Sequence, residues 1–430
     1  MAGAQDDGAN RQTPRPPSPP PELAGKNAAT ASTPPARNMG AAADMARARA
    51  DASLAGQVAS PDASLLADDG LTATSHAGLL YPWGARTPQV GEVLRMADSL
   101  SWARIPMPGS LGHINTWLLD DDGRGGAAHP ASAAHNGGVA VVDTGLLLPL
   151  CSDAWKALFS GPLADVPVTR VLCTHLHPDH IGLAGWIAKR FDAPIWMTRG
   201  EWLTARYMIA DVRDEQPAEV TAQQRGSGWD DDAIDAARAR GWGQFARMIF
   251  RLPHAYRRMV DGELLQFGRH EWRVVVGSGH SPEHACLWNE RDGLLVSGDQ
   301  VLPRISSNVS LHAGEPDADP LGEWLASIDR LMLLPDDVLV CPAHGDPFTG
   351  LHVRLAALRD EHHQRLDALA AALTTPGRVV DCFSLLFKRD IGDEHRFMAT
   401  GEALAHLRHL EVTGRVVRAT VDGVWWWSAT

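Results

Sequence analysis

The stretch Val171–Gly182, "VLCTHLHPDHIG", carries the strongest signal in this chain of 430 residues. Its apolar start predicts a buried strand, and the amphipathic run that follows it predicts a helix. Between them, three histidines and one aspartate fall within six residues, from His175 to His180. Imidazole and carboxylate groups together suit zinc, iron or manganese. The turn therefore predicts a metal site at the end of a strand.

A metal ion needs more ligands than one turn supplies, and three further candidates follow apolar runs. His280 follows "VVVGSG", Asp299 follows "LLVSG", and His344 follows "VLVCPA". Each stands where a predicted buried strand ends, with a glycine nearby that lets the backbone approach a crowded site. One such histidine alone is more often structural, but the group together indicates a single assembled site.

The order of these motifs resembles that of the metallo-β-lactamase superfamily. His-x-His-x-Asp-His is followed by Gly-His, Gly-Asp and a late His-Gly, and "VVDTG" (Val141–Gly145) precedes them. The resemblance is specific because several independent motifs occur in the expected order. It implies an α/β fold, an αββα sandwich in which two mixed sheets face each other with helices outside.

The resemblance also implies roles for particular residues. A first metal ion would take His175, His177 and His280, a second would take Asp179, His180 and His344, and Asp299 would bridge the two. Asp143 of "VVDTG" would orient a ligand from behind. His177 stands where the diiron electron-transfer branch has a glutamate, which implies a hydrolase. Asp179 and Asp299 would be the catalytic carboxylates that orient a metal-activated hydroxide and exchange its proton. The implied cofactor is a pair of Zn²⁺ ions, with Fe²⁺ or Mn²⁺ as alternatives.

Three regions are expected along the chain. Residues 1–75 are rich in Ala, Pro and Gly and poor in large apolar residues, which predicts a disordered tail. Residues 76–350 alternate predicted strands and helices, which indicates the catalytic domain. Residues 351–430 contain three predicted helices and a hairpin that turns at Asp422-Gly423, which predicts a winged-helix-like domain.

This C-terminal region resembles the branch of the superfamily typified by lactamase-β-like protein 2. Its members are single-strand endoribonucleases or thioesterases of acyl or polyketide substrates. One departure is "GHSPEH", where many relatives have a glycine at the position of Glu283. That departure does not change the expected metal ligands, but the resemblance then does not decide which substrate class applies.

Composition limits the partners. The formal net charge is −13, whereas a phosphate backbone is bound through basic surface, so a nucleic acid is the less favoured partner. The five cysteines form no CxxC pair and are expected to be reduced, buried and structural. With no apolar signal segment and no run long enough to span a membrane, the sequence predicts a cytoplasmic protein.

Two activities therefore compete. The first is hydrolysis of a small-molecule thioester, ester or lactone. The alternative is a single-strand-specific endoribonuclease, which would use a basic track of Lys388, Arg389, Arg396, Arg408, Arg415 and Arg418. The triple tryptophan at 425–427 is expected to pack into the core rather than to stack on bases, because alternate strand residues face opposite sides.

Four other histidines are weighed as parts of the site. His284 is expected to support the ligands and not to be one. His113 could line the pocket entrance, although a structural role is favoured. His362 and His363 lie on a charged helix and are expected to be solvated, since adjacent helical residues do not face the same way.

Overall fold

The computed structural model describes residues 73–121, 137–388 and 390–430, all of which belong to one compact unit, Val58–Thr430. Residues 1–72 of the predicted tail lie outside the described residues, as do residues 122–136. Thr74 and Ser75, which end the predicted tail, belong to a strand instead. A short antiparallel pair, β1 (Thr74–His76) and β2 (Leu79–Tyr81), begins the described part.

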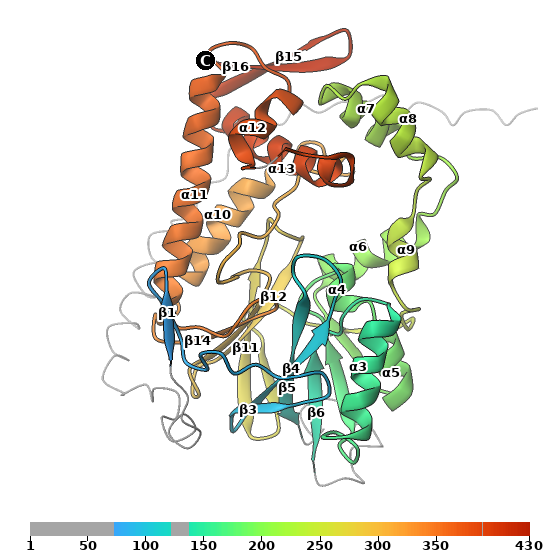
Figure 1. The fold of residues 1–430 in the computed structure, drawn as a ribbon, viewed down its shortest axis with the longest axis vertical. Coiled ribbons are helices and arrows are strands. Elements are labelled where there is room, and N and C mark those ends of the chain that lie inside the picture. Colours follow the sequence, from blue (N-terminus) through green and yellow to red (C-terminus); the bar gives the residue numbers. More distant parts are fainter. Residues whose placement is uncertain (1–72, 122–136, 389) are drawn as a thin grey trace, which may run out of the picture. The chain divides into compact units, whose positions relative to one another are not determined.

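The first sheet contains seven described strands that follow one another in chain order. Figure 1 labels β3 to β6 among them. They are β3 (Leu94–Ala97), β4 (Leu100–Pro106), β5 (His113–Asp121), β6 (Gly138–Val142), β7 (Val168–Leu172), β8 (Ile195–Met197) and β9 (Arg257–Arg258). The pairs from β3 to β6 are antiparallel, and those from β6 to β9 are parallel. The sheet is therefore mixed, as predicted, and β6 and β7 end side by side.

The second sheet contains five described strands, again in chain order. They are β10 (Leu264–Phe267), β11 (His270–Gly277), β12 (His284–Asn289), β13 (Leu294–Gly298) and β14 (Leu339–Pro342). Only the β13–β14 pair is parallel. Because β13 and β14 run in the same direction, the residues that follow them, Asp299 and His344, leave the same edge of the sheet.

The two sheets face each other across a buried apolar layer. Trp117 of β5, Trp272 of β11 and Val296 of β13 belong to this one cluster. Their sequence neighbours point the other way: Leu118 packs beneath the helices of the first sheet, and Leu295 beneath those of the second. The alternation follows from the two-residue repeat of a strand, and it makes both sheets buried on both faces.

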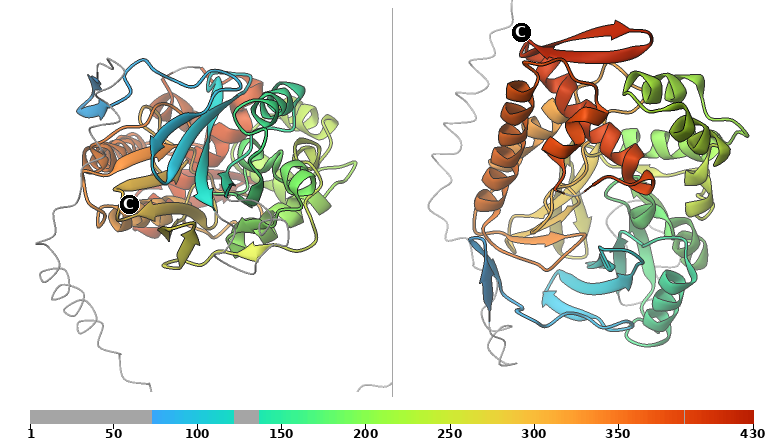
Figure 2. Two further views of the ribbon diagram at one scale, coloured as in Figure 1. Left: turned by 90° about the horizontal axis from the view of Figure 1, so that it is seen from below. Right: turned by 45° about the horizontal axis from the view of Figure 1, so that its top comes forward.

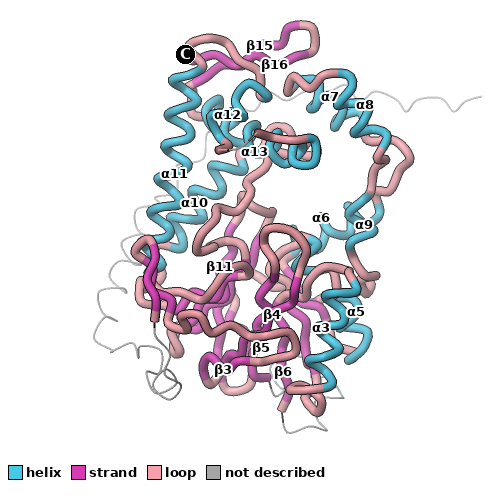
Figure 3. Tube along the Cα trace, viewed as in Figure 1, coloured by secondary structure: helices cyan, strands magenta, loops and turns pink. Residues whose placement is uncertain are grey.

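Helices cover the outer faces and confirm the predicted αββα sandwich. On the first sheet lie α3 (Pro149–Ser160), α5 (Ala184–Phe191) and α6 (Arg199–Ala210), and on the second lies α10 (Pro320–Leu331). Figure 3 shows these helices on opposite sides of the strands. Three shorter helices follow α6 in the chain: α7 (Ala218–Gly226), α8 (Asp231–Ala239) and α9 (Gln244–Met248). One further turn, α4 (Pro178–Ile181), belongs to the site.

The C-terminal elements are three α-helices, one 3₁₀ turn and a hairpin. They are α11 (Leu351–Ala372), the turn Val380–Cys382, α12 (Phe383–Leu386), α13 (Asp393–Val412), β15 (Val416–Val421) and β16 (Val424–Ala429). Asp422 and Gly423 have φ angles of 51° and 80°, so the predicted hairpin turn is confirmed. Figure 2 shows this hairpin beside α7. The description of these elements as a winged helix stays a prediction.

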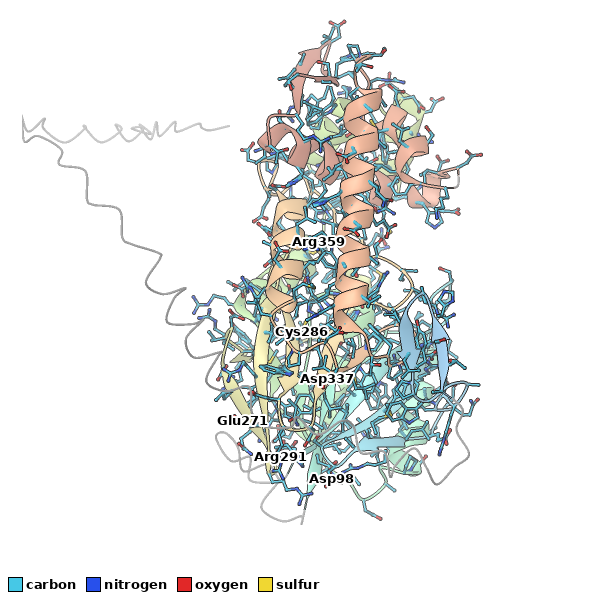
Figure 4. All side chains as sticks on the ribbon, turned by 90° about the vertical axis from the view of Figure 1, so that its left-hand side faces the viewer. Asp98, Glu271, Cys286, Arg291, Asp337 and Arg359 are labelled. Atoms are coloured by element: carbon cyan, nitrogen blue, oxygen red, sulfur yellow. The ribbon has the colours of Figure 1, made fainter. Side chains whose placement is uncertain are left out.

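The C-terminal helices share a core with the second sheet. Leu358 of α11 and Leu407 of α13 belong to the same buried cluster as Trp324 of α10. Figure 4 shows α10 and α11 side by side, and Arg359 of α11 donates to Asp329 of α10 at 3.4 Å. The second sheet and the C-terminal region are thus packed together by apolar contact.

Two expectations for this region have opposite outcomes. The prediction that His362 is solvated is wrong: its side chain is buried between α11 and α13, where it meets His406 at 3.2 Å, whereas His363 is exposed. His362 therefore lies on the buried side of α11, together with Leu358 and Leu366. The prediction that the tryptophans pack is confirmed, because Trp427 is buried and Trp425 packs against the same core.

Candidate metal centre

The ends of β6 and β7 build the first ligand turn. Asp143 follows β6 and is buried, and its carboxylate accepts hydrogen bonds from the backbone N–H of Thr174 at 2.8 Å and from its hydroxyl at 2.9 Å. These bonds hold the chain where β7 ends and His175 begins. Pro178 then starts α4, which places Asp179 and His180 on its first turn. The dense histidine motif is thus a strand end, a bend and a short helix.

Three histidines form the first set of donors. His175 Nε2 lies 2.8 Å from His177 Nδ1 and 3.2 Å from His280 Nε2, and the three atoms form one compact group. Ligands of a tetrahedral zinc ion with bonds of about 2.05 Å lie roughly 3.3 Å apart. The two separations measured from His175 Nε2 are close to that spacing.

The second set contains Asp179, His180 and His344. Asp179 Oδ2 lies 3.2 Å from His344 Nε2 and 3.6 Å from His180 Nε2. All three donor atoms again form one compact group. A carboxylate and two imidazoles are the ligand types that divalent transition metals share.

Asp299 lies between the two sets and turns one oxygen towards each. Its Oδ1 is 3.5 Å from both His180 Nε2 and His344 Nε2, and its Oδ2 is 3.5 Å from His280 Nε2. A carboxylate in this position can contact two cations at once and offset their mutual repulsion. The seven predicted residues are therefore brought together in the arrangement that the resemblance implies.

The hydrogen bonding of these residues tests whether metal ions would fit. The buried atoms His180 Nε2, His344 Nε2 and Asp299 Oδ1 have no hydrogen-bond partner among the described residues. Buried polar groups are rarely left in that state, and an ion is one of the reasons. Three unpaired donor atoms that face one another, beside four more ligands of suitable type, fit a pair of divalent ions.

The opposite side of each ring is held by the protein. Nδ1 of His180 lies 2.8 Å from Asp143, that of His280 lies 2.7 Å from the Asn308 carbonyl, and that of His344 lies 2.9 Å from the His113 carbonyl. The carbonyl and carboxylate oxygens accept these hydrogen bonds, so each ring donates through Nδ1 and turns Nε2 towards the other candidate ligands. Such contacts orient histidine ligands and fix their tautomer.

The protonation of these groups follows from their surroundings. Burial lowers the pKa of His177 to about 3, and burial likewise lowers the pKa of His175 and of His280. These rings are therefore neutral and able to bind a metal. Burial also lowers the pKa of His180, but Asp143, Asp179 and Asp299 outweigh it and raise that pKa well above its ordinary value. Excess negative charge on this side favours a cation.

The remaining histidines take supporting positions. His284 is fully buried, and its Nε2 accepts the backbone N–H of Asp299 at 3.0 Å, so it holds Asp299 in place and does not itself face the two groups of candidate ligands. His113 contributes its carbonyl to His344, and its own ring, at the start of β5, is partly buried. Both observations agree with the supporting roles favoured by the sequence.

Sequence reasoning missed two groups around the site. Glu201 of α6 is fully buried and contacts the loops on which the ligands stand. Asn308, whose carbonyl holds His280, donates through its side chain to Glu402 of α13 at 3.0 Å. Neither residue stands in a recognisable motif, because each acts through a contact with a distant part of the chain.

Comparison with known proteins agrees with this geometry. Residues 131–344 match the metallo-beta-lactamase superfamily, and residues 366–430 match the C-terminal domain of metallo-beta-lactamase-like proteins. The crystal structure of a beta-lactamase domain protein from Burkholderia ambifaria is 36% identical, with a TM-score of 0.73. That similarity covers 82% of this chain and 98% of the other. The chain therefore belongs to the metallo-beta-lactamase superfamily and carries the C-terminal domain of metallo-beta-lactamase-like proteins.

Relatives whose names state an activity are less similar to this chain in sequence. A probable metallo-hydrolase of Bacillus subtilis is 29% identical over 34% of this chain and 46% of its own length. An atrochrysone carboxyl ACP thioesterase of Aspergillus terreus is 23% identical over 52% of this chain and 51% of its own. A hydroxyacylglutathione hydrolase of Rhodospirillum rubrum is 29% identical over 35% of this chain and 55% of its own. The chain thus spans only about half the length of these relatives.

Two further predictions are addressed by the described residues. All five cysteines are free and buried, as expected. Among the described helices, none combines the length and the apolar character that crossing a membrane requires.

Proposed function

We propose that this protein is a metal-dependent hydrolase of a small-molecule thioester, ester or lactone. The observation that carries the proposal is the position of Asp299, whose two oxygens face different groups of ligands at 3.5 Å. That arrangement supports two bound ions, for which Zn²⁺ suits the nitrogen-rich ligands and Fe²⁺ or Mn²⁺ are alternatives. When bound, such ions polarise a carbonyl and lower the pKa of water towards neutrality.

The protein's own residues supply position and charge. His175, His177 and His280 would hold one ion, Asp179, His180 and His344 the other, and Asp299 both. Burial raises the pKa of Asp179, but His180 and His344 outweigh it and lower that pKa to about 2. Asp179 is therefore ionised at neutral pH, and it can orient the attacking water and accept its hydrogen bond. Asp143 keeps His180 in the correct tautomer.

The substrate class is supported by the relatives. One has the name of an acyl-carrier-protein thioesterase, and another that of a hydrolase of acylglutathione, which is also a thioester. A thioester carbonyl is uncharged, so its binding requires no basic surface. We place the enzyme in the reducing cytoplasm, which agrees with its five free cysteines.

The alternative, a ribonuclease, is weakened by the state of the arginines on the expected basic track. Arg408 and Arg418 both lie near Glu411, Arg415 pairs with Asp367, and Arg396 pairs with Asp393. Lys388 is exposed, and Arg389 lies outside the described residues. Trp425 packs over Gly226, so it is not a free surface for stacking a base. The neighbouring carboxylates offset the positive charge of these arginines, which weakens their attraction for phosphate groups.

A parallel screen tests the proposal. The purified protein is assayed with acyl-thioesters, esters, lactones and single-stranded RNA while its metal content is measured. We expect up to two metal ions per chain and turnover of a thioester, ester or lactone that changes little between low and moderate salt. Cleavage of RNA with a steep salt dependence would support the ribonuclease instead. Retention of two ions by the double variant His175→Ala/His180→Ala would refute the assigned ligands.

A further inference from the structure

Glu201 occupies an unusual position on the first turn of α6. Its side chain is fully buried although it is a carboxylate, and carboxylates are almost never buried without partners. Burial raises its pKa to about 7, even though hydrogen bonds from Ser281, Glu283 and Leu176 lower it. Burying this carboxylate removes it from water at a cost in free energy, so its contacts should show what the buried position achieves.

Those contacts join the two loops that carry the first ligand set. Oε2 of Glu201 accepts the backbone N–H of Leu176 at 2.9 Å, between His175 and His177. Oε1 accepts the Ser281 hydroxyl and the Glu283 backbone N–H, both at 2.7 Å, directly after His280. One carboxylate therefore ties the β7–α4 loop to the loop that follows β11.

Glu283 returns the contact. Its side-chain Oε2 accepts the backbone N–H of Gly200 at 2.8 Å, and its carbonyl accepts the Thr198 hydroxyl at 2.7 Å. The first N–H groups of a helix have no partner within the helix, so an acidic group from elsewhere can cap them. A Cβ on Gly200 would lie 3.0 Å from Glu283 Cγ, which shows how closely the two segments approach.

We propose that Glu201 and Glu283 form a reciprocal clasp that sets the distance between His280 and the pair His175 and His177, with Glu201 as a positioning residue. The inference rests on the proposed metal-dependent function. It also gives a purpose to Glu283, the residue at which this chain departs from the pattern of many relatives. A carboxylate that served α6 alone could remain exposed, as Glu219 does on the first turn of α7.

The isosteric variant Glu201→Gln separates positioning from packing. Three donors converge on the carboxylate, but an amide offers only one oxygen, so one donor must face the amide N–H₂. We expect the affinity for Co²⁺ to fall by about 10- to 100-fold, the usual cost of losing an outer partner of metal ligands. The visible spectrum of the Co²⁺ protein should change as well, because it reports the ligand geometry.

Companion variants sharpen the test. Glu283→Ala removes the cap on Gly200 and should weaken Co²⁺ binding, whereas Glu283→Gln keeps an accepting oxygen and should weaken it less. The matched control is Glu219→Gln, in an exposed residue at the same place on another helix, which should leave affinity and spectrum unchanged. Circular dichroism verifies that each variant is folded at the temperature of the titration.

Amide hydrogen exchange of the metal-free protein provides an independent measurement. Peptides covering residues 174–178 and 280–284 should exchange faster in Glu201→Gln than in the wild type. Wild-type Co²⁺ affinity, spectrum and exchange in that variant would overturn the clasp. If the wild-type protein bound no Co²⁺, the proposed metal-dependent function would fail instead, and unchanged exchange would still decide against the clasp.

Discussion

Replacing Asp143 by asparagine tests how the second ligand set is oriented. The carboxylate has Oδ1 on the Thr174 backbone N–H, and Oδ2 on the Thr174 hydroxyl and His180 Nδ1. Its φ angle is 61°, a left-handed conformation that asparagine tolerates better than most residues. The substitution therefore keeps the shape and backbone and changes only the hydrogen bonding and charge.

The expected magnitude follows from those three contacts. If the amide nitrogen replaces Oδ2, it faces the Nδ1–H of His180, and the ring escapes this repulsion only by moving its proton to Nε2. That atom is the one that points towards Asp179 and Asp299. If the nitrogen replaces Oδ1, it faces the Thr174 backbone N–H instead. Losing such a partner weakens metal binding by about 10- to 100-fold, or roughly 1.4 to 2.7 kcal/mol.

The measurement is a chelator competition that resolves the affinity for each ion. The ion held by His180 should lose the most affinity, because that ring contacts Asp143 directly. The ion held by His175, His177 and His280 should lose less, since His175 reaches Asp143 only through the Thr174 hydroxyl. Asp153→Asn, in an exposed residue of α3, is the control. Wild-type affinity for both ions in Asp143→Asn would refute the reasoning.

Three other outcomes are expected. Asp299→Asn should lower the turnover number by at least about 100-fold and loosen the ion pair, and near-normal turnover with two ions bound would show that Asp299 is a bystander. Burial lowers the pKa of His406 to about 4, so its contribution to stability is complete above pH 6.5 and is lost as the pH falls towards 4. Between pH 7.5 and pH 5 the free energy of unfolding should fall by about 2 kcal/mol because of this histidine. Denaturation curves at the two pH values should show that His406→Gln lacks this loss. An equal loss in the wild type and the variant would contradict the prediction. Gly401→Ala would place a Cβ 2.7 Å from Ser310 Oγ and should cost about 1–3 kcal/mol of unfolding free energy, which Ser310→Gly in the same chain should partly restore.

Local patterns were sufficient to find the candidate ligands and several of the elements. Apolar runs that end just before His or Asp predicted β7, β11, β13 and β14, and the hairpin was predicted from Asp422-Gly423. The strand β4 (Leu100–Pro106) was not assigned, because its serine and arginine interrupt the apolar pattern. Strand ends that carry His or Asp are visible in a short window, so the candidate ligands could be found without coordinates.

Contacts between distant segments were not accessible in this way. The partners Glu201 and Ser281 lie 80 residues apart in the chain, and Asn308 and Glu402 lie 94 apart. The solvated position expected for His362 was wrong because the charge around it on α11 belongs to the exposed face, while His362 turns towards α13. No local pattern records which helix will cover a given face.

The amino-acid sequence by itself determined the ligand types, their order and their placement at strand ends, because spacing and apolar periodicity are local properties of the chain. Only the tertiary structure decided that the oxygens of Asp299 divide between two groups of candidate ligands, and that Asn308 and Glu201 hold His280 and the loops in place. The physical reason is that a metal centre requires donor atoms placed to within fractions of an ångström. That precision comes from the packing of two sheets and their covering helices, which brings together residues that are far apart in sequence.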